Sequence, residues 1–158
     1  MTVLKHVTGL VAIFLVTVFP IMIRSGDICE ESADRAEAYV SSFVDEAAAQ
    51  RMINGMCIDK LSALLAREPD VYDFYVTVGI RHLVPRGGSY YVNMEHEQIM
   101  SLIERGETIS LEEGDTVTVC ATVSSPSQFS RITGMYENER ERDNRKITVG
   151  RRIGRDGR

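Results

Sequence analysis

The chain has 158 residues and a net charge of −5, and it is 44% hydrophobic and 26% charged, without tryptophan. That length suits one modest domain, and the composition excludes a collagen-like chain, a disordered chain and a multi-pass membrane protein. Residues 24–136 carry 9 basic and 18 acidic side chains, which argues against nucleic acid as a partner because phosphate binding needs a concentrated positive surface.

The first feature along the chain is an uncharged apolar segment, Val7–Ile23, in which thirteen of seventeen residues are apolar. As a helix rising 1.5 Å per residue it spans roughly 25 Å, near the lower limit for a bilayer core. Lys5 and Arg24 flank it and can reach the membrane interfaces, while Pro20 is expected to bend its outer end. We predict a transmembrane helix with lipid-facing residues along its length: Val7, Leu10, Phe14, Val18 and Ile23.

This segment is predicted to be an uncleaved anchor, with a cleaved signal peptide as the alternative. Cleavage after Gly26 would place Arg24 three residues before the cut, where signal peptidase requires a small residue. Basic charge before the segment and acidic charge after it favour a cytoplasmic N-terminus, residues 1–6. The domain, residues 27–149, is then extracytoplasmic, and the protein is expected in the cell membrane.

A break at Ser25-Gly26 is expected to precede an amphipathic helix over Glu30–Met52. Apolar residues recur there at spacings of three and four, which is typical of a helix with one buried face. We expect this face to pack on the chain's own domain, with a partner surface as the alternative. Its residues are Ala36, Val40, Phe43, Val44 and Ala47.

The middle of the chain changes between helical and strand patterns. A second helix is expected over Met56–Arg67, and the alternation of Val71–Val84 predicts a strand with one buried face. Tyr90–Val92 is expected to be a short extended piece. Asn93 then caps a helix that ends near Arg105.

The last third holds the clearest strand pattern. After the turn Glu113–Asp115, valine and alanine alternate with threonine and cysteine up to Pro126. Ser127 is expected to cap a short helix, and Lys146–Val149 to form a final strand. Residues 150–158 are predicted to be a basic, flexible tail.

This order predicts an α+β fold. The N-terminal transmembrane helix continues into an amphipathic helix that packs on a small, mostly antiparallel sheet. Three strands with one apolar face each need a helical cover, and the stripe from Ala33 to Ala47 is the best candidate.

No pattern typical of catalysis, metal binding or cofactor binding is present. His6, His82 and His96 are far apart, and Glu95 and Glu97 diverge from His96 around a helix. A Gly-x-Ser-x-Gly elbow and a phosphate-binding glycine loop are also absent. We therefore predict a protein that is not an enzyme and needs no metal or cofactor.

The three cysteines, Cys29, Cys57 and Cys120, form no Cys-x-x-Cys pair. Three reduced thiols are the simplest interpretation. Outside the membrane, a Cys57–Cys120 disulfide that joins helix to sheet is the alternative. Cys29, just beyond the apolar segment, could pair between chains or carry a lipid.

The arrangement of a membrane helix, an amphipathic helix and a small sheet resembles the pilins and pseudopilins of type IV and tight-adherence systems. The segments Phe43–Glu46, Leu61–Leu65, Val71–Asp73 and Gly114–Val119 are similar to small uncharacterised anchored proteins of Gram-positive bacteria. This resemblance implies a subunit or accessory of a pilus or secretion assembly.

The expected function is therefore that of a non-enzymatic, single-pass surface protein with a pilin-like role. Its expected partners are the lipid bilayer and other proteins, including further copies that associate through the N-terminal helix. A membrane-anchored extracytoplasmic binding module and a secreted domain released by signal cleavage are the alternatives.

Overall fold

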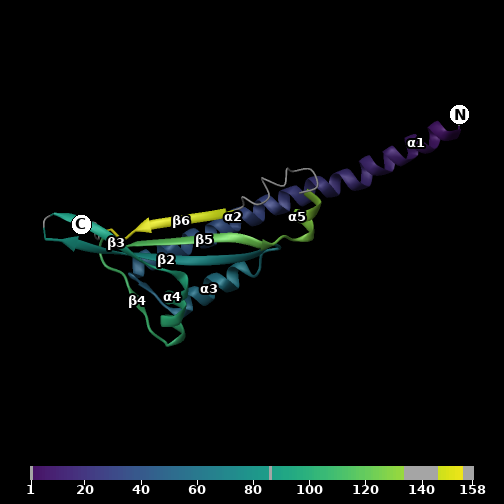
Figure 1. The fold of residues 1–158 in the computed structure, drawn as a ribbon. Helices are drawn as coiled ribbons and strands as arrows, with labels where there is room; N and C mark the ends of the chain where they lie inside the picture. The colour runs from purple at the N-terminus through teal and green to yellow at the C-terminus, as the bar shows by residue number, and fades with distance from the viewer. Residues whose placement is uncertain (1, 86, 134–145, 155–158) are drawn as a thin grey trace.

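The computed structural model describes residues 2–85, 87–133 and 146–154. It confirms an α+β fold with a long N-terminal helix and antiparallel sheets (Figure 1). The elements in chain order are α1 (Thr2–Ile13), the π-helix η1 (Phe14–Val18), α2 (Phe19–Gln50), β1 (Met52–Ile53), α3 (Gly55–Leu65), β2 (Val71–Val84), β3 (Gly88–Met94), α4 (His96–Glu104), β4 (Ile109–Ser110), β5 (Thr116–Ser125), α5 (Gln128–Thr133) and β6 (Lys146–Arg152).

The N-terminal helix runs without interruption from α1 to Gln50, so the expected break at Ser25-Gly26 is wrong. The Ser25 hydroxyl donates to the Ile21 carbonyl at 2.7 Å, which keeps it within the helix. Ser25 and Cys29 are buried, and the Cys29 thiol lies 3.2 Å from the Ser130 hydroxyl of α5. Contact with α5 thus covers a segment whose glycine and serine would weaken an isolated helix.

The helix accommodates Pro20 by widening one turn before it. In η1, the Phe19 N–H donates to the Phe14 carbonyl five residues back, and the Thr17 hydroxyl donates to the Ile13 carbonyl at 2.6 Å. A π-turn gives room to a proline ring that would otherwise clash with the preceding turn. The helix therefore continues through Pro20, and α1 projects away from the rest of the molecule (Figure 1).

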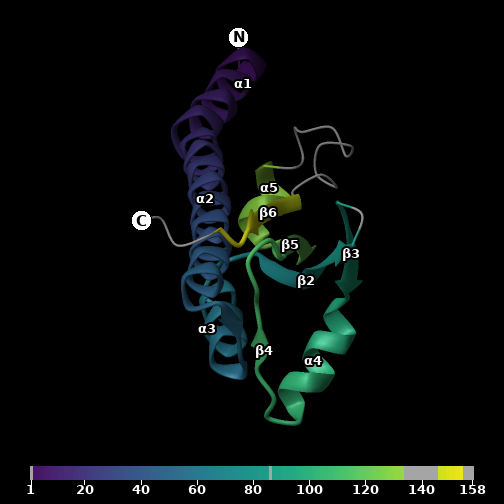
Figure 2. The same cartoon turned by 90° about the vertical axis from the view of Figure 1, so that its left-hand side faces the viewer.

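The main sheet has four antiparallel strands in the order β3-β2-β5-β6. Val76 of β2 lies opposite Val119 of β5, which lies opposite Val149 of β6, so one face carries a continuous apolar row. β1 and β4 form a separate two-stranded pair. In Figure 2, α2 and α3 lie on the same side of the four-stranded sheet.

The core is built from helices and strands together. One cluster of buried side chains includes residues from α2, α3, β2, β5 and the chain after β6. Its largest fully buried members are Ile53, Leu61, Leu65, Ile99, Ile153, Val40, Val44, Val76, Val78, Val117 and Val119.

The expected helix cap at Asn93 is also wrong. Asn93 does not cap a helix, because it pairs with Gly79 as part of the seven-residue strand β3. Helix α4 instead begins after Glu95, whose side chain forms a reciprocal capping box with Gln98.

The last strand extends beyond its expected end at Val149, so residues 150–152 belong to the sheet and not to a flexible tail. Ile153 is buried as well: its N–H donates to the Asp115 carbonyl, and its own carbonyl accepts from the Gly114 N–H. Residues 155–158 of the expected tail lie outside the described residues.

Candidate functional site

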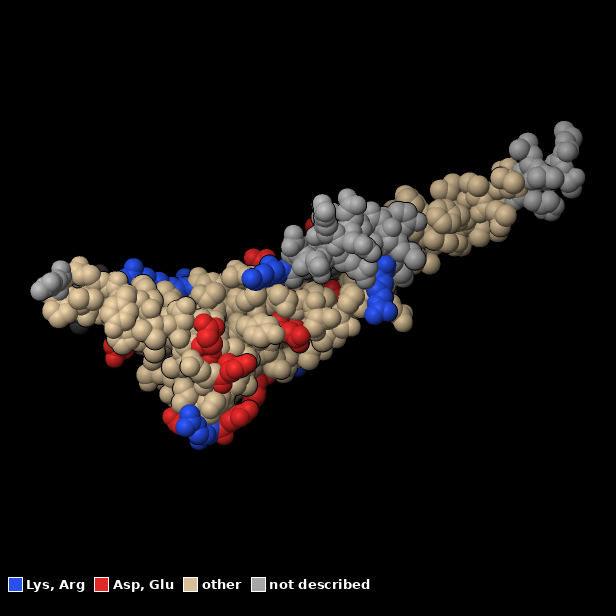
Figure 3. Space-filling view, viewed as in Figure 1, with Lys and Arg blue, Asp and Glu red and all other residues tan. Residues whose placement is uncertain are grey.

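The first candidate surface is the apolar part of the long helix. The expected lipid-facing residues are all exposed, from 39% for Val18 to 68% for Leu10. Figure 3 shows this region as a surface without Lys, Arg, Asp or Glu. Within the described residues, one helix is long and apolar enough to cross a bilayer, namely the one that contains this segment. The residues are Val7, Leu10, Phe14, Val18 and Ile23.

The second half of the same helix has the opposite exposure. All five residues of its expected packing face are at most 5% exposed and belong to the core cluster. They are Ala36, Val40, Phe43, Val44 and Ala47. A single helix therefore combines a bare apolar half with a half that contributes to the core.

Ion pairs fix the polar flank of α2 to its neighbours. Lys60 of α3 donates to Glu46 at 2.6 Å, which lowers the pKa of Glu46 and raises the pKa of Lys60. Arg35 donates to Glu68 at 3.0 Å, and this hydrogen bond raises the pKa of Arg35. The Glu68 side chain is only 3% exposed, whereas the pair between Glu46 and Lys60 is largely exposed, and exposed ion pairs contribute little individually to stability.

A buried polar cluster holds α5 against the start of β2. The Asp70 carboxylate is 2% exposed and accepts from the Ser127 N–H at 2.6 Å and the Ser130 hydroxyl at 2.8 Å. The Ser130 hydroxyl also lies beside Cys29 of α2. Buried carboxylates require such donors, because desolvation without them costs several kilocalories per mole. The cluster joins three segments that are far apart in the sequence.

The alternative Cys57–Cys120 disulfide is not formed in the structure, where both are free thiols. Cys57 belongs to the core cluster on the helical side of the sheet. Cys120 alternates along β5 with the buried Val119 and Ala121, so its side chain points to the other face of the sheet. The sheet thus separates the two sulfur atoms.

The histidines do not converge. His82 stacks on Tyr90 with ring centroids 5.2 Å apart, whereas the His96 Nδ1 accepts a hydrogen bond from the Val76 N–H at 3.2 Å. Among the described residues, no three His, Cys, Asp or Glu side chains are placed to hold a metal ion. His96 instead covers a backbone donor at the edge of β2.

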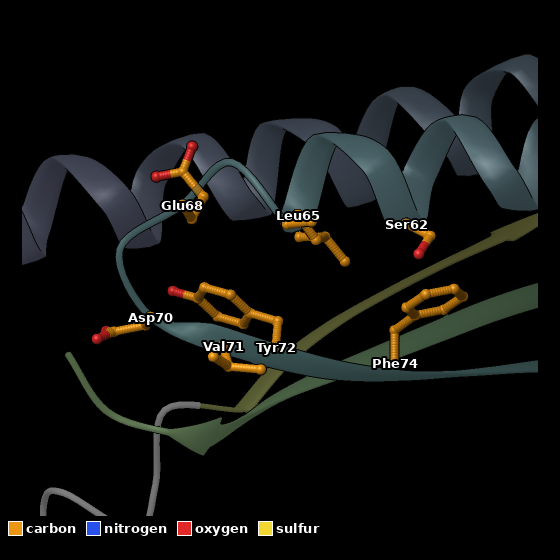
Figure 4. Close-up of a pocket in the computed structure, with 8 residues that line it drawn as sticks. Ser62, Leu65, Glu68, Asp70, Val71, Tyr72 and Phe74 are labelled. Carbon is orange, nitrogen blue, oxygen red and sulfur yellow. The ribbon is translucent and has the colours of Figure 1, made fainter.

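Another candidate surface is a groove between α3 and β2, which the sequence does not predict. Two adjoining hollows of about 220 and 470 Å³ share Ser62, Tyr72 and Phe74. In Figure 4, Ser62 and Leu65 of α3 face Tyr72 and Phe74 of β2 across the smaller hollow. We call this the β2–α3 groove, and its lining is Ile58, Asp59, Ser62, Leu65, Ala66, Glu68, Asp70, Val71, Tyr72, Asp73, Phe74, Tyr75, His96 and Met100.

Comparison with known proteins adds nothing to this geometry. No protein-family model matches the chain, and neither a curated protein nor a solved structure matches it. The function must therefore be argued from the helix, the core and the groove themselves.

Proposed function

We propose that this chain is a non-enzymatic, single-pass membrane protein that acts as a pilin-like subunit or accessory of a pilus or secretion assembly. One observation carries the proposal: the bare apolar segment and the core-forming helix are one continuous helix. We use the word head for the buried second half of α2 together with the elements from β1 to β6. Because the helix is continuous, movement of the membrane segment would be transmitted directly to the head. A signal peptide that is discarded has no need of such continuity.

The lipid bilayer is the natural environment for the first half of this helix. The segment has seventeen uncharged residues, of which thirteen are apolar, and exposure of these apolar side chains to water would be costly. In lipid, the backbone groups of the segment are already hydrogen-bonded within the helix. Arg24 is exposed at the end of the segment and can reach an interface. The proposed orientation has the N-terminus in the cytoplasm and the head outside.

Assembly would use the same segment. Packing between membrane helices depends on close van der Waals contact and on interhelical hydrogen bonds. Gly9 allows close approach because it has no side chain, and the space beside it is open in this chain. Copies that bundle through residues 7–23 would present their heads side by side.

Cysteine scanning tests this proposal. Single cysteines at positions 10–22 in native membranes should form cross-linked dimers or cross-links to another helix, with yields that repeat every three to four residues. A cysteine in place of Ala38, on the exposed side of α2, is the matched control and should cross-link weakly. A uniformly monomeric pattern across positions 10–22 would contradict the assembly role.

The binding-module alternative is favoured by one observation, the β2–α3 groove on the head. Replacing residues 7–23 with an unrelated membrane anchor separates the two roles. Function that survives the exchange supports a binding module, and function that is lost supports helix-mediated assembly. Intact-mass analysis of the mature protein tests the secreted form, which would lack about the first 25 residues.

A further inference from the structure

The β2–α3 groove lies along a strand edge that is only half occupied. β5 pairs with β2 over residues 71–79, whereas β3 pairs with it only from Val78 to Val84. On the side away from β5, residues 73–77 therefore have no neighbouring strand among the described residues. An unpaired edge of this kind is a template for another extended chain.

The hydrogen bond to His96 shows in which direction the backbone groups of β2 point along this edge. The Val76 N–H donates to the His96 imidazole and therefore points away from β5. Because backbone groups in an antiparallel strand alternate in direction, the N–H and C=O of Phe74 point to the same open side. No backbone hydrogen bond to Phe74 is formed there within the described part of the chain. His96 thus closes one position of the edge and leaves the next one open.

Side chains beside this edge provide both an apolar surface and uncompensated negative charge. Phe74 is half-buried and lines both hollows, together with Ile58 and Met100 in the wider one. Asp59 and Asp73 also line the wider hollow and are exposed, and neither has a cationic partner among the described residues. The acidic groups here contrast with Glu46 and Glu68 nearby, which are paired.

We propose that the open edge of β2 binds an extended, basic segment of a partner polypeptide as an added strand in line with β3. Backbone hydrogen bonds to Phe74 would supply the pairing. Because side chains alternate along a strand, one set would enter the groove against Phe74, and the other would lie on the face that carries Asp73. The partner segment should therefore alternate apolar residues with Lys or Arg. The inference goes beyond the membrane role and stands independently of it.

A second copy of the chain is a poorer occupant. Antiparallel pairing of two such edges about Phe74 would put the two Asp73 carboxylates on the same sheet face at diagonal positions, about 7–8 Å apart. Like charges so placed destabilise the pairing, whereas a basic strand would neutralise them. Charge thus selects against self-association at this edge.

Binding is tested with two fluorescent six-residue peptides and the full chain in detergent micelles. One peptide alternates valine and lysine, and the other alternates valine and glutamate. We expect anisotropy to show saturable binding of the lysine peptide and none of the glutamate peptide. Hydrogen exchange in the complex should slow at the Phe74 amide. Equal binding of both peptides, or binding without protection of Phe74, would overturn the proposal.

Variants locate the site. The double change Asp59→Lys and Asp73→Lys should weaken binding of the lysine peptide roughly tenfold. Asp34→Lys, on the exposed side of α2, is the matched control and should leave it unchanged. Phe74→Leu, which keeps the N–H, should bind better than Phe74→Pro, which removes it. If Asp34→Lys weakens binding as much as the double change, the charge argument is wrong.

Sedimentation and hydrogen exchange of the full chain without peptide test whether a second copy of the chain occupies the edge. We expect that protection of the Phe74 amide does not increase with protein concentration. Concentration-dependent dimers in which Phe74 becomes protected would assign the edge to a second copy and overturn the proposal. Loss of assembly through the membrane helix would leave all these readouts unchanged, so failure of the proposed function remains distinguishable.

Discussion

Truncation of Phe43 measures how strongly the second half of the long helix is held by the head. Phe43 is 5% exposed and belongs to the core cluster, so Phe43→Ala removes a buried ring and leaves a cavity. Such changes cost about 3–5 kcal/mol in the free energy of unfolding. For a head of this size, at about 4 °C per kcal/mol, we expect the melting temperature to fall by roughly 12–20 °C.

The assay is thermal unfolding of the full chain in detergent micelles, followed by the near-ultraviolet circular dichroism of its six tyrosines. Phe14→Ala is the matched control, because it makes the same change on the same helix at a residue that is 46% exposed. It should leave the melting temperature of the head almost unchanged. Equal effects of the two substitutions, or a fall of less than about 4 °C for Phe43→Ala, would refute the assignment of this helix half to the core.

Three further changes test local features. Asp70→Ala should loosen α5 and therefore speed alkylation of the Cys29 thiol, which site-resolved mass spectrometry measures. An unchanged alkylation rate would show that the Asp70 carboxylate does not hold α5 in place. Gly114→Ala should cost more stability in urea than Gly106→Ala. Both residues have positive φ, but only the Cβ at 114 would meet the chain, with an arginine Cδ at 2.7 Å; equal losses would contradict this. The pKa of Glu46 is lowered by its lysine partner, so its contribution to stability is complete above about pH 4.3 and is lost as the pH falls through the folded-state pKa. Glu46→Gln should therefore flatten the decline of melting temperature from about pH 5 to pH 3. An unaltered decline would show that the ion pair of Glu46 does not contribute to stability.

The regular parts of the fold could be predicted because the spacing of apolar residues along each element indicates which side chains are buried. The alternation in Val71–Val84 and in Thr116–Ser125 places both strands correctly, and the spacing of apolar residues in α2 finds its buried face. Errors occurred where long-range contacts outweigh local preference. Ser25-Gly26 predicts a break, yet these residues are helical beneath α5. Ile153 is an isolated apolar residue, so the neighbouring sequence does not indicate that it is buried in the core.

The groove was missed because it arises from an offset between strands, which no local pattern encodes. One signal was available: Val71–Val84 is fourteen residues long, so it exceeds what a short following strand can pair with along its whole edge. The sequence pattern around His96 suggests only a possible metal ligand, and nothing in it indicates a bond to the backbone of a strand. The bond of His96 to the Val76 N–H depends on α4 packing beside β2, which the sequence does not reveal.

β6 follows the other described elements in the chain, and this sets an order of events during synthesis. The buried face of α2 is made soon after the apolar helix, but β6, the strand that contacts α2, is made after all the other strands. Asp45 forms an ion pair with Arg151, and Arg51 donates to the Gly154 carbonyl, so both ends of the head close together. Until β6 has been made, the α2 face lacks part of its cover, and a chaperone would find its binding surface there.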